Sequence, residues 1–170
     1  TRFVHEKGEV FNISADYEGI LQKGLGARRA EFERLAKSSE GEKKIFAESV
    51  EKVLAALQRL IGRYADEAEK LGLAEQSLTL RAVKDGPPKT FLQALQLLRA
   101  VHFAIWASGS YHNTLGRIDQ YLYPFYRSDA DSGALDDVEA FELLEEFFLA
   151  CNRDSDLYAG MQPVSYTHLT

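Results

Sequence analysis

The sequence predicts a mainly α-helical domain, on three observations. Over residues 46–71, apolar side chains recur at steps of three and four with charged residues between them, which is typical of an amphipathic helix. The stretch Phe91–Ala107 is apolar on nearly every side, which is typical of a helix buried inside a large protein. Only residues 77–83 show an alternating pattern that would suit a strand.

The first half of the chain contains three predicted helices. The first spans residues 16–38, although Gly19, Gly24 and Gly26 weaken its first half, since each glycine costs about 1 kcal/mol relative to alanine. The second spans residues 42–71 and ends at Gly72. A shorter helix is predicted over residues 74–83, before a loop that contains Gly86 and two prolines.

A fourth helix is predicted to begin after Thr90, because Gln93 follows it at the spacing of a helix cap. It continues to Ala107. Beyond a turn, the pattern predicts a short helix over residues 117–123, since Pro124 limits its continuation.

The segment RSDADSGALDD, which follows that short helix, is predicted to be a loop. Asp136 and Glu139 then form a second cap pattern, and they open a last helix that runs to Asn152.

The composition excludes several classes of protein. The 26 acidic and 20 basic residues give a net charge of −6 with no basic cluster, so we expect no nucleic-acid partner. A single cysteine rules out an internal disulfide and suits a reducing compartment. No apolar run reaches the roughly 20 residues that a membrane helix needs, and the first ten residues lack an apolar signal core. We therefore expect a cytoplasmic protein that makes no membrane contact and whose first residue is an internal start.

The last eight residues, PVSYTHLT at positions 163–170, differ in character from the segment before them. Back-translated in frame, they resemble the mosaic-end adapter of transposon-based sequencing libraries. We therefore expect residues 163–170 to be a non-native tail, and residues 1–162 to be a partial domain of a longer protein.

Cysteine and histidine offer little sign of catalytic or metal chemistry. Cys151 lies on the apolar stripe of the last helix, and no neighbouring His or Lys would activate its thiol, which favours a structural role. His5, His102 and His112 share no metal-ligand spacing, so no metal site is predicted. His102 lies inside the apolar helix and is interpreted as a core histidine with a hydrogen-bond partner.

Asp119 is the acid with the most unusual surroundings. It follows a turn at Gly116, lies two residues after Arg117 and is flanked by several aromatic residues. A carboxylate desolvated by such rings needs a partner. Arg117 or a backbone amide would make the motif purely structural, whereas a substrate hydroxyl or cation would make it a binding site. The residues alone leave both readings open.

Three motifs in this order resemble the N-terminal part of the pyruvate formate-lyase-like glycyl radical enzymes: PPKTFLQALQLL, GRIDQYLYPFY and FFLACNRDSDLYAGMQ. The resemblance is strongest over residues 87–162 and extends back to residues 12–24. It implies that this chain is the helical N-terminal part of a ten-stranded α/β barrel, in which helices flank the strands. It also implies a role in anaerobic metabolism and a homodimer at full length.

The same resemblance implies a radical reaction that breaks a C–C, C–O, C–N or C–S bond. In the family, an activating enzyme with S-adenosylmethionine and an iron–sulfur cluster installs a radical on a backbone glycine near the C-terminus. A mid-chain cysteine then carries the radical to the substrate. Cys151 does not match that cysteine motif. This chain would therefore be inactive alone, with no catalytic residue and no bound cofactor of its own.

What the resemblance assigns to this chain is part of a pocket for a small-molecule substrate. Asp119, Tyr111 and His112 would face the substrate, with Gly116 and Arg117 as structural residues beside them. Asn12 occupies a position where relatives often have a histidine, and this departure puts in doubt a close match to members that rely on that histidine. The alternative function is a non-catalytic helical module that binds a protein or small ligand.

Overall fold

A computed structural model describes residues 13–108 and 113–154 of the chain. Within them lie the helices α1 (Tyr17–Lys37), α2 (Gly41–Lys70), α3 (Ala74–Asp85), α4 (Phe91–Ala107), α5 (Ile118–Ser132) and α6 (Asp137–Arg153). Two short strands, β1 (Ile13–Ser14) and β2 (Asn113–Thr114), complete the described elements. The prediction of a mainly α-helical chain is confirmed. The tail at residues 163–170 and three predicted site residues, Asn12, Tyr111 and His112, lie outside the described ranges.

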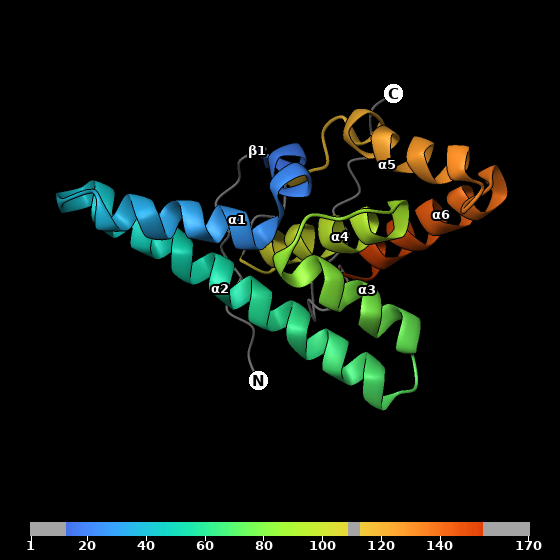
Figure 1. The fold of residues 1–170 in the computed structure, drawn as a ribbon, viewed down its shortest axis with the longest axis horizontal. Coiled ribbons are helices and arrows are strands. Elements are labelled where there is room, and N and C mark those ends of the chain that lie inside the picture. The colour runs from blue at the N-terminus through green and yellow to red at the C-terminus, as the bar shows by residue number, and fades with distance from the viewer. Residues whose placement is uncertain (1–12, 109–112, 155–170) are drawn as a thin grey trace, which may run out of the picture.

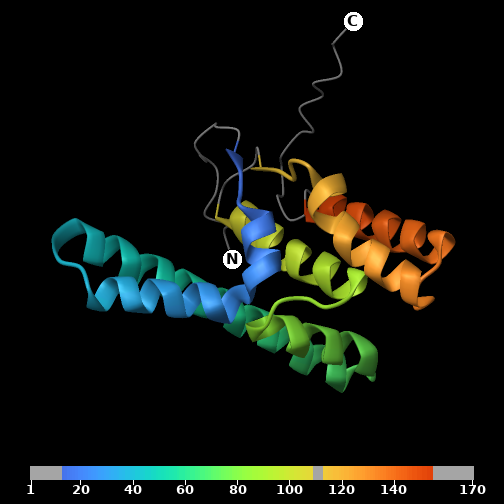
Figure 2. The ribbon, with the colours of Figure 1, turned by 45° about the horizontal axis from the view of Figure 1, so that its top comes forward.

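Helix α4 lies between two groups of helices. On one side, α1 and α2 form a long antiparallel hairpin and α3 packs against α2 (Figure 1). On the other side, α5 and α6 each pack against α4, as the turned view also shows (Figure 2). Because α4 contacts all five other helices described, its apolar surface is the common centre of the fold.

Most side chains of the buried core come from α1, α2, α3 and α4, and α5 and α6 add Leu122, Ala140 and Phe147. The largest fully buried members are Leu21, Leu25, Ile61, Val83, Leu97 and Leu98. Burying a side chain of this size contributes about 1.5–3 kcal/mol to folding. The heptad-like pattern of α2 explains its share, since Leu54, Leu57 and Ile61 lie on the side that faces α1 and α3.

Helix α4 is buried unevenly along its length. Its buried residues all fall between Phe91 and Val101, whereas Phe103, Ile105 and Trp106 near its C-terminal end are partly exposed. The expectation that so apolar a helix needs other helices around it is met over its first three turns. None of the helices in the part of the chain that the structure describes is long and apolar enough to cross a membrane.

The caps predicted from the sequence are present at two helix starts. The Thr90 Oγ1 atom accepts a hydrogen bond from the Gln93 backbone amide at 3.2 Å, and the Gln93 side chain accepts one from the Lys89 amide at 2.8 Å. Asp136 and Glu139 form a reciprocal capping box at the start of α6. These bonds satisfy backbone donors that have no partner inside the helix.

The prediction for α5 was wrong in length. The helix does not stop at Pro124 but continues to Ser132, so most of the predicted loop RSDADSGALDD is helical. Pro124 removes one backbone donor, yet it lies on the exposed side of the helix, where water can satisfy the carbonyl that loses its partner. Tertiary contacts thus outweigh the local preference.

Those contacts lie just beyond the proline. The Tyr126 ring meets the Phe91 ring at 6.0 Å between centroids, and its hydroxyl donates to Asp137 Oδ1 at 2.7 Å. Asp129 Oδ2 accepts a hydrogen bond from the Phe91 amide at 2.7 Å, so α5 caps the start of α4. The helix then ends at Gly133 in the left-handed conformation.

The strand-like pattern at residues 77–83 lies inside α3. Ser77, Thr79 and Val83 of this segment are buried. Packing against α2 and α4 therefore decides the structure of a segment whose local pattern was ambiguous.

Gly24 interrupts α1 with φ 77° and ψ 161°, values that essentially only glycine adopts. A Cβ atom at this position would lie 2.5 Å from the Gly86 carbonyl carbon and from the Pro87 nitrogen. The glycine therefore lets α1 approach the loop between α3 and α4. What the sequence presented as a weak half of a helix is a close contact between two backbones.

Gly24→Ala is expected to lower the free energy of unfolding by about 3 kcal/mol or more, because it adds backbone strain to a direct clash. Gly72→Ala is the matched control: Gly72 has φ 79°, but a Cβ atom there would meet nothing within 4 Å. It should cost about 1–2 kcal/mol. Urea denaturation of both variants measures the difference. Equal losses of unfolding free energy in the two variants would show that the close approach of α1 to the Gly86–Pro87 backbone does not add to the cost of Gly24→Ala.

Candidate functional site

The candidate site lies at the start of α5, where the chain turns sharply. Gly116 has φ 63°, and a Cβ atom on it would lie 2.8 Å from Ser14 Oγ, so the turn rests directly against β1. Arg117 is the N-cap residue of α5, and Asp119 lies in its first turn. An acid at this position also interacts favourably with the positive end of the helix.

Arg117 and Asp119 form a bidentate ion pair. Arg117 Nε donates to Asp119 Oδ1 at 2.8 Å, and Arg117 Nη2 donates to Oδ2 at 2.6 Å. This bond to Arg117 is the main cause that holds the pKa of Asp119 below its ordinary value, so the carboxylate is charged at neutral pH. Of the partners considered for Asp119, the structure shows Arg117 first, and the backbone amides of Asp119 and Gln120 also lower the pKa of the carboxylate.

The pair is more exposed than the aromatic sequence context suggested. The side chains of Arg117 and Asp119 are 67% and 62% exposed, so the expected desolvation of Asp119 by its aromatic neighbours is not seen here. Tyr121 points away from it and donates its hydroxyl to the Leu115 carbonyl at 2.7 Å. An exposed ion pair of this kind is weak and can rearrange around another polar group.

Asp119 borders a mainly apolar groove of about 400 Å³ between α5 and α6. Ile118, Leu122 and Tyr123 line it from α5, and Phe141 and Phe148 line it from α6. Phe141 and Phe148 are 60% and 51% exposed, respectively. The groove therefore combines a large apolar surface with a charged carboxylate at its edge, which is the usual composition of a small-molecule pocket.

Behind the turn, three polar side chains from distant parts of the chain meet. The Tyr17 hydroxyl of α1 donates to Asn113 Oδ1 of β2 at 2.9 Å and lies 3.0 Å from His102 Nδ1 of α4. Asn113 Nδ2 lies 3.2 Å from the same ring nitrogen. Burial is the largest cause that raises the pKa of Tyr17 and lowers that of His102, so both groups are neutral at pH 7.

This network confirms the interpretation of His102 as a core histidine with hydrogen-bond partners. The roles of Tyr17 and Asn113 were not predicted from the sequence. The partners lie 85 and 96 positions apart from Tyr17, so no local pattern could have paired them.

Strand pairing joins the segment that begins at Ile13 to the segment that begins at Asn113. β1 and β2 are parallel, with Ile13 opposite Asn113 and Ser14 opposite Thr114. In the sequence, Ile13 directly follows Asn12 and Asn113 directly follows His112. The described residues next to the predicted site positions are therefore neighbours in space, as are Gly116, Arg117 and Asp119.

Cys151 is partly buried against the core, as expected for a structural cysteine. Burial is also the main cause that raises the pKa of its thiol. It is therefore protonated at neutral pH and is a poor nucleophile.

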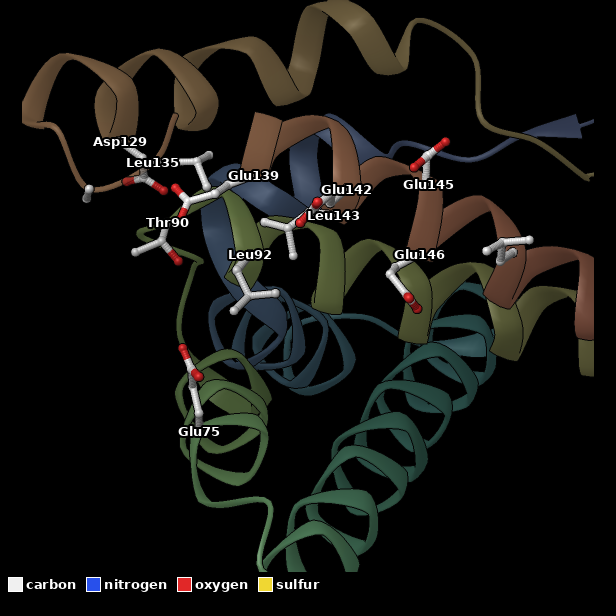
Figure 3. A pocket seen from close by; sticks show the side chains of 12 residues that line it. Glu75, Thr90, Leu92, Asp129, Leu135, Glu139, Glu142, Leu143, Glu145 and Glu146 are labelled. Carbon is white, nitrogen blue, oxygen red and sulfur yellow. The ribbon is translucent and has the colours of Figure 1, made fainter. Parts of the chain in front are cut away.

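A second concavity, of about 670 Å³, lies among α3, α4, α5 and α6 and is strongly acidic (Figure 3). Its carboxylates come from Glu75, Asp129, Glu139, Glu142, Glu145 and Glu146. Two of them already have structural partners, since Asp129 caps α4 and Glu139 belongs to the capping box. Among residues 13–108 and 113–154, no three His, Cys, Asp or Glu side chains are placed to hold a metal ion.

Comparison with known proteins places this arrangement in context. The model of the family described as "Pyruvate formate lyase-like" matches residues 3–161. The "Probable dehydratase YbiW" of Escherichia coli K12 is 30% identical over 159 residues, which are 81% of this chain and 19% of that protein. The trans-4-hydroxy-L-proline dehydratase of Clostridioides difficile is 32% identical over 145 residues, which are 78% of this chain and 18% of that protein.

The crystal structure of a glycyl radical enzyme from Archaeoglobus fulgidus has a similar fold, with a TM-score of 0.75 and 29% identity. The match covers 79% of this chain and 20% of that structure. The chain thus spans about a fifth of the length of these relatives. The expectation that it resembles a helical part of a glycyl radical enzyme is confirmed.

Arg117→Gln is expected to raise the pKa of Asp119 toward the 3.8 of an unperturbed aspartate, because the variant loses the charge-assisted hydrogen bonds. Carboxyl carbon chemical shifts, followed by NMR between pH 2 and 6, measure this pKa. Arg127→Gln is the control, since Arg127 pairs with Asp131 on the same helix. An Asp119 pKa that stays equally low in both variants would contradict the assigned cause.

Proposed function

Because this chain belongs to the pyruvate formate lyase-like family, we propose that it forms part of a glycyl radical enzyme of the dehydratase or lyase branch. The family is one of enzymes, and two of its relatives above carry dehydratase names. The observation that carries the proposal within this chain is the charged Asp119 at the edge of an apolar groove. Such a carboxylate suits a small substrate with a hydroxyl group or a positive charge.

Asp119 is the proposed substrate-binding residue. Each oxygen of a carboxylate has two lone pairs, and Arg117 occupies one on each oxygen. The free lone pairs accept a hydrogen bond from a substrate hydroxyl, or the charge balances a substrate cation. Arg117 and Gly116 support this role by holding the turn, and the exposed pair can adjust when substrate arrives.

Tyr111, His112 and Asn12 complete the proposed pocket. Support comes from the family resemblance and from the pairing of Ile13 with Asn113, which directly follow Asn12 and His112 in the sequence. Polar groups at these positions would orient the substrate, and the surrounding rings would exclude water from a reactive intermediate. Asn12 in place of the histidine of some relatives points to a different set of hydrogen bonds with the substrate.

The radical chemistry would be supplied by a glycyl radical and a cysteine outside this chain. Cys151 is protonated and partly buried, which suits a structural role, and it is not proposed to be the cysteine that carries the radical. This chain is thus proposed to contribute part of the substrate pocket and to be catalytically inactive alone. One further proposed partner is an activating enzyme that uses S-adenosylmethionine and an iron–sulfur cluster. Another is a second copy of the full-length enzyme. The proposed location of this assembly is the cytoplasm.

The proposal is tested on the full reading frame that contains this chain. The protein is treated under anaerobic conditions with its activating enzyme and S-adenosylmethionine, and electron paramagnetic resonance measures the organic radical per chain. Turnover is then assayed with a panel of diols, amino alcohols, hydroxylated amino acids and hydroxysulfonates. A reading frame that yields no radical, or one without a mid-chain cysteine loop, would contradict the proposal that this chain is part of a glycyl radical enzyme.

Asp119→Asn in that enzyme is expected to raise KM by about tenfold or more, because the neutral amide no longer makes a charge-assisted bond to the substrate. The radical content should not change. Asp131→Asn is the matched control, since Asp131 is also an exposed aspartate paired with an arginine on α5. Equal KM values for Asp119→Asn and the wild type would remove Asp119 from the pocket.

A further inference from the structure

Two of the three short contacts among Tyr17, His102 and Asn113 involve the same hydroxyl group. The Tyr17 oxygen lies 2.9 Å from Asn113 Oδ1 and 3.0 Å from His102 Nδ1, and the tyrosine is only 2% exposed. A buried contact of this length between two polar atoms is favourable only when a hydrogen lies between them. Since a tyrosine hydroxyl has a single hydrogen, one contact must use a hydrogen from another group.

The direction of the Tyr17 hydrogen follows from which atoms can only accept. Asn113 Oδ1 cannot donate, so the Tyr17 hydrogen must point to it. The second hydrogen can come from His102, with Nδ1–H donating to the Tyr17 oxygen. Nδ1 cannot also accept from Asn113 Nδ2, so only one of its two contacts is a hydrogen bond. The contact with the Tyr17 oxygen is the shorter one, at 3.0 Å against 3.2 Å for Asn113 Nδ2, which favours the hydrogen on Nδ1.

We propose that Tyr17 and His102 are positioning residues: a directed chain of hydrogen bonds runs from His102 Nδ1–H through the Tyr17 hydroxyl to Asn113 Oδ1 and holds the start of β2 in place. In this arrangement His102 is neutral and carries its hydrogen on Nδ1, with Nε2 unprotonated. This is the tautomer that a free histidine side chain adopts less often. Its presence would therefore be direct evidence for the proposed hydrogen bonds.

Apart from the Tyr121–Leu115 hydrogen bond and the contact of Gly116 with Ser14, the segment that these hydrogen bonds hold has little other support. β1 and β2 contribute only two residues each, and a pairing of that length is marginal by itself. Asn113 is the first residue of β2, and Gly116, Arg117 and Asp119 follow within six positions. The position of the Asp119 turn relative to α1 and α4 therefore depends on where Asn113 is held.

The surroundings of His102 favour its neutral form. Burial is the largest cause that lowers its pKa, the charge of Arg99 on α4 lowers it further, and the charge of Asp154 after α6 raises it. Tyr17 faces it from α1 as a neutral hydroxyl. Cys151 on α6 interacts with Tyr17 and is also neutral at this pH. Measurements at pH 7.5 therefore sample the uncharged imidazole.

The test is an NMR spectrum of the histidine ring nitrogens, recorded at pH 7.5 on the polypeptide labelled with ¹⁵N-histidine. Long-range proton–nitrogen correlations distinguish a protonated from an unprotonated ring nitrogen, and the His102→Gln variant identifies the His102 signals among the four histidines. The expected result is a protonated Nδ1 and an unprotonated Nε2. The reverse pattern in the wild-type chain would overturn the proposal.

Two matched variants separate the hydrogen-bond chain from simple packing. Tyr17→Phe keeps the ring and removes the hydroxyl, so the His102 tautomers should shift toward Nε2–H and amide exchange at residues 113–115 should become about tenfold faster. Tyr121→Phe removes a hydroxyl from the neighbouring ring, 6.2 Å away, which binds the Leu115 carbonyl and not His102. It should leave the tautomer unchanged. A Tyr17→Phe variant with wild-type tautomer and exchange would overturn the positioning role.

The consequence for catalysis rests on the proposed function and is measured separately. In the full-length enzyme, Tyr17→Phe should raise KM several-fold more than it lowers kcat, at unchanged radical content. A wild-type enzyme that forms no radical would contradict the proposed function and leave the NMR result standing. A normal radical with an unchanged KM in Tyr17→Phe would overturn only the effect on the pocket.

Discussion

The burial of α4 is the constraint on which the other helices depend. A helix that is apolar on almost every side is stable only when helices cover it on both sides, and α4 has α1, α2 and α3 on one side and α5 and α6 on the other. Apart from Arg99, which pairs with Asp154 at 2.6 Å, two polar contacts near its ends connect it to neighbouring helices. Asp129 of α5 caps its first turn, and His102 near its last turn meets Tyr17. These contacts therefore fix the position of both ends of α5, the helix that carries Asp119, relative to α4.

Much of the fold could be predicted from the sequence, because helix caps and apolar periodicity are local signals. The limits of α4 and the capping box of α6 followed directly from them. The length of α5 did not, since Pro124 is a local stop signal and the contacts that overcome it come from Phe91 and Asp137. The role of Gly24 was hidden for the same reason, because the backbone that it approaches is some sixty residues away in the sequence.

The candidate site was predictable only in part. The sequence placed Gly116, Arg117 and Asp119 beside one another, and the ion pair between the last two is a short-range contact. It also suggested that the aromatic residues nearby would shield the acid. Whether the rings shield the acid depends on the direction of each side chain along the helix. Tyr121 is directed toward Leu115, and Asp119 remains at the surface. Contacts across eighty or more positions, such as those of Tyr17, need a three-dimensional structure.

The pairing of β1 with β2 has a consequence for how the chain folds. Ile13 and Asn113 are a hundred positions apart in the sequence, and all of α1 to α4 lies between them. Bringing such distant residues together costs loop-closure entropy, which two residues of strand on each side cannot repay until the helices between them have packed. The helical layers should form first and the strand pair last. During synthesis, a chain that has left the ribosome only as far as Ala107 can pack α1 to α4 before β2 is available to pair with β1.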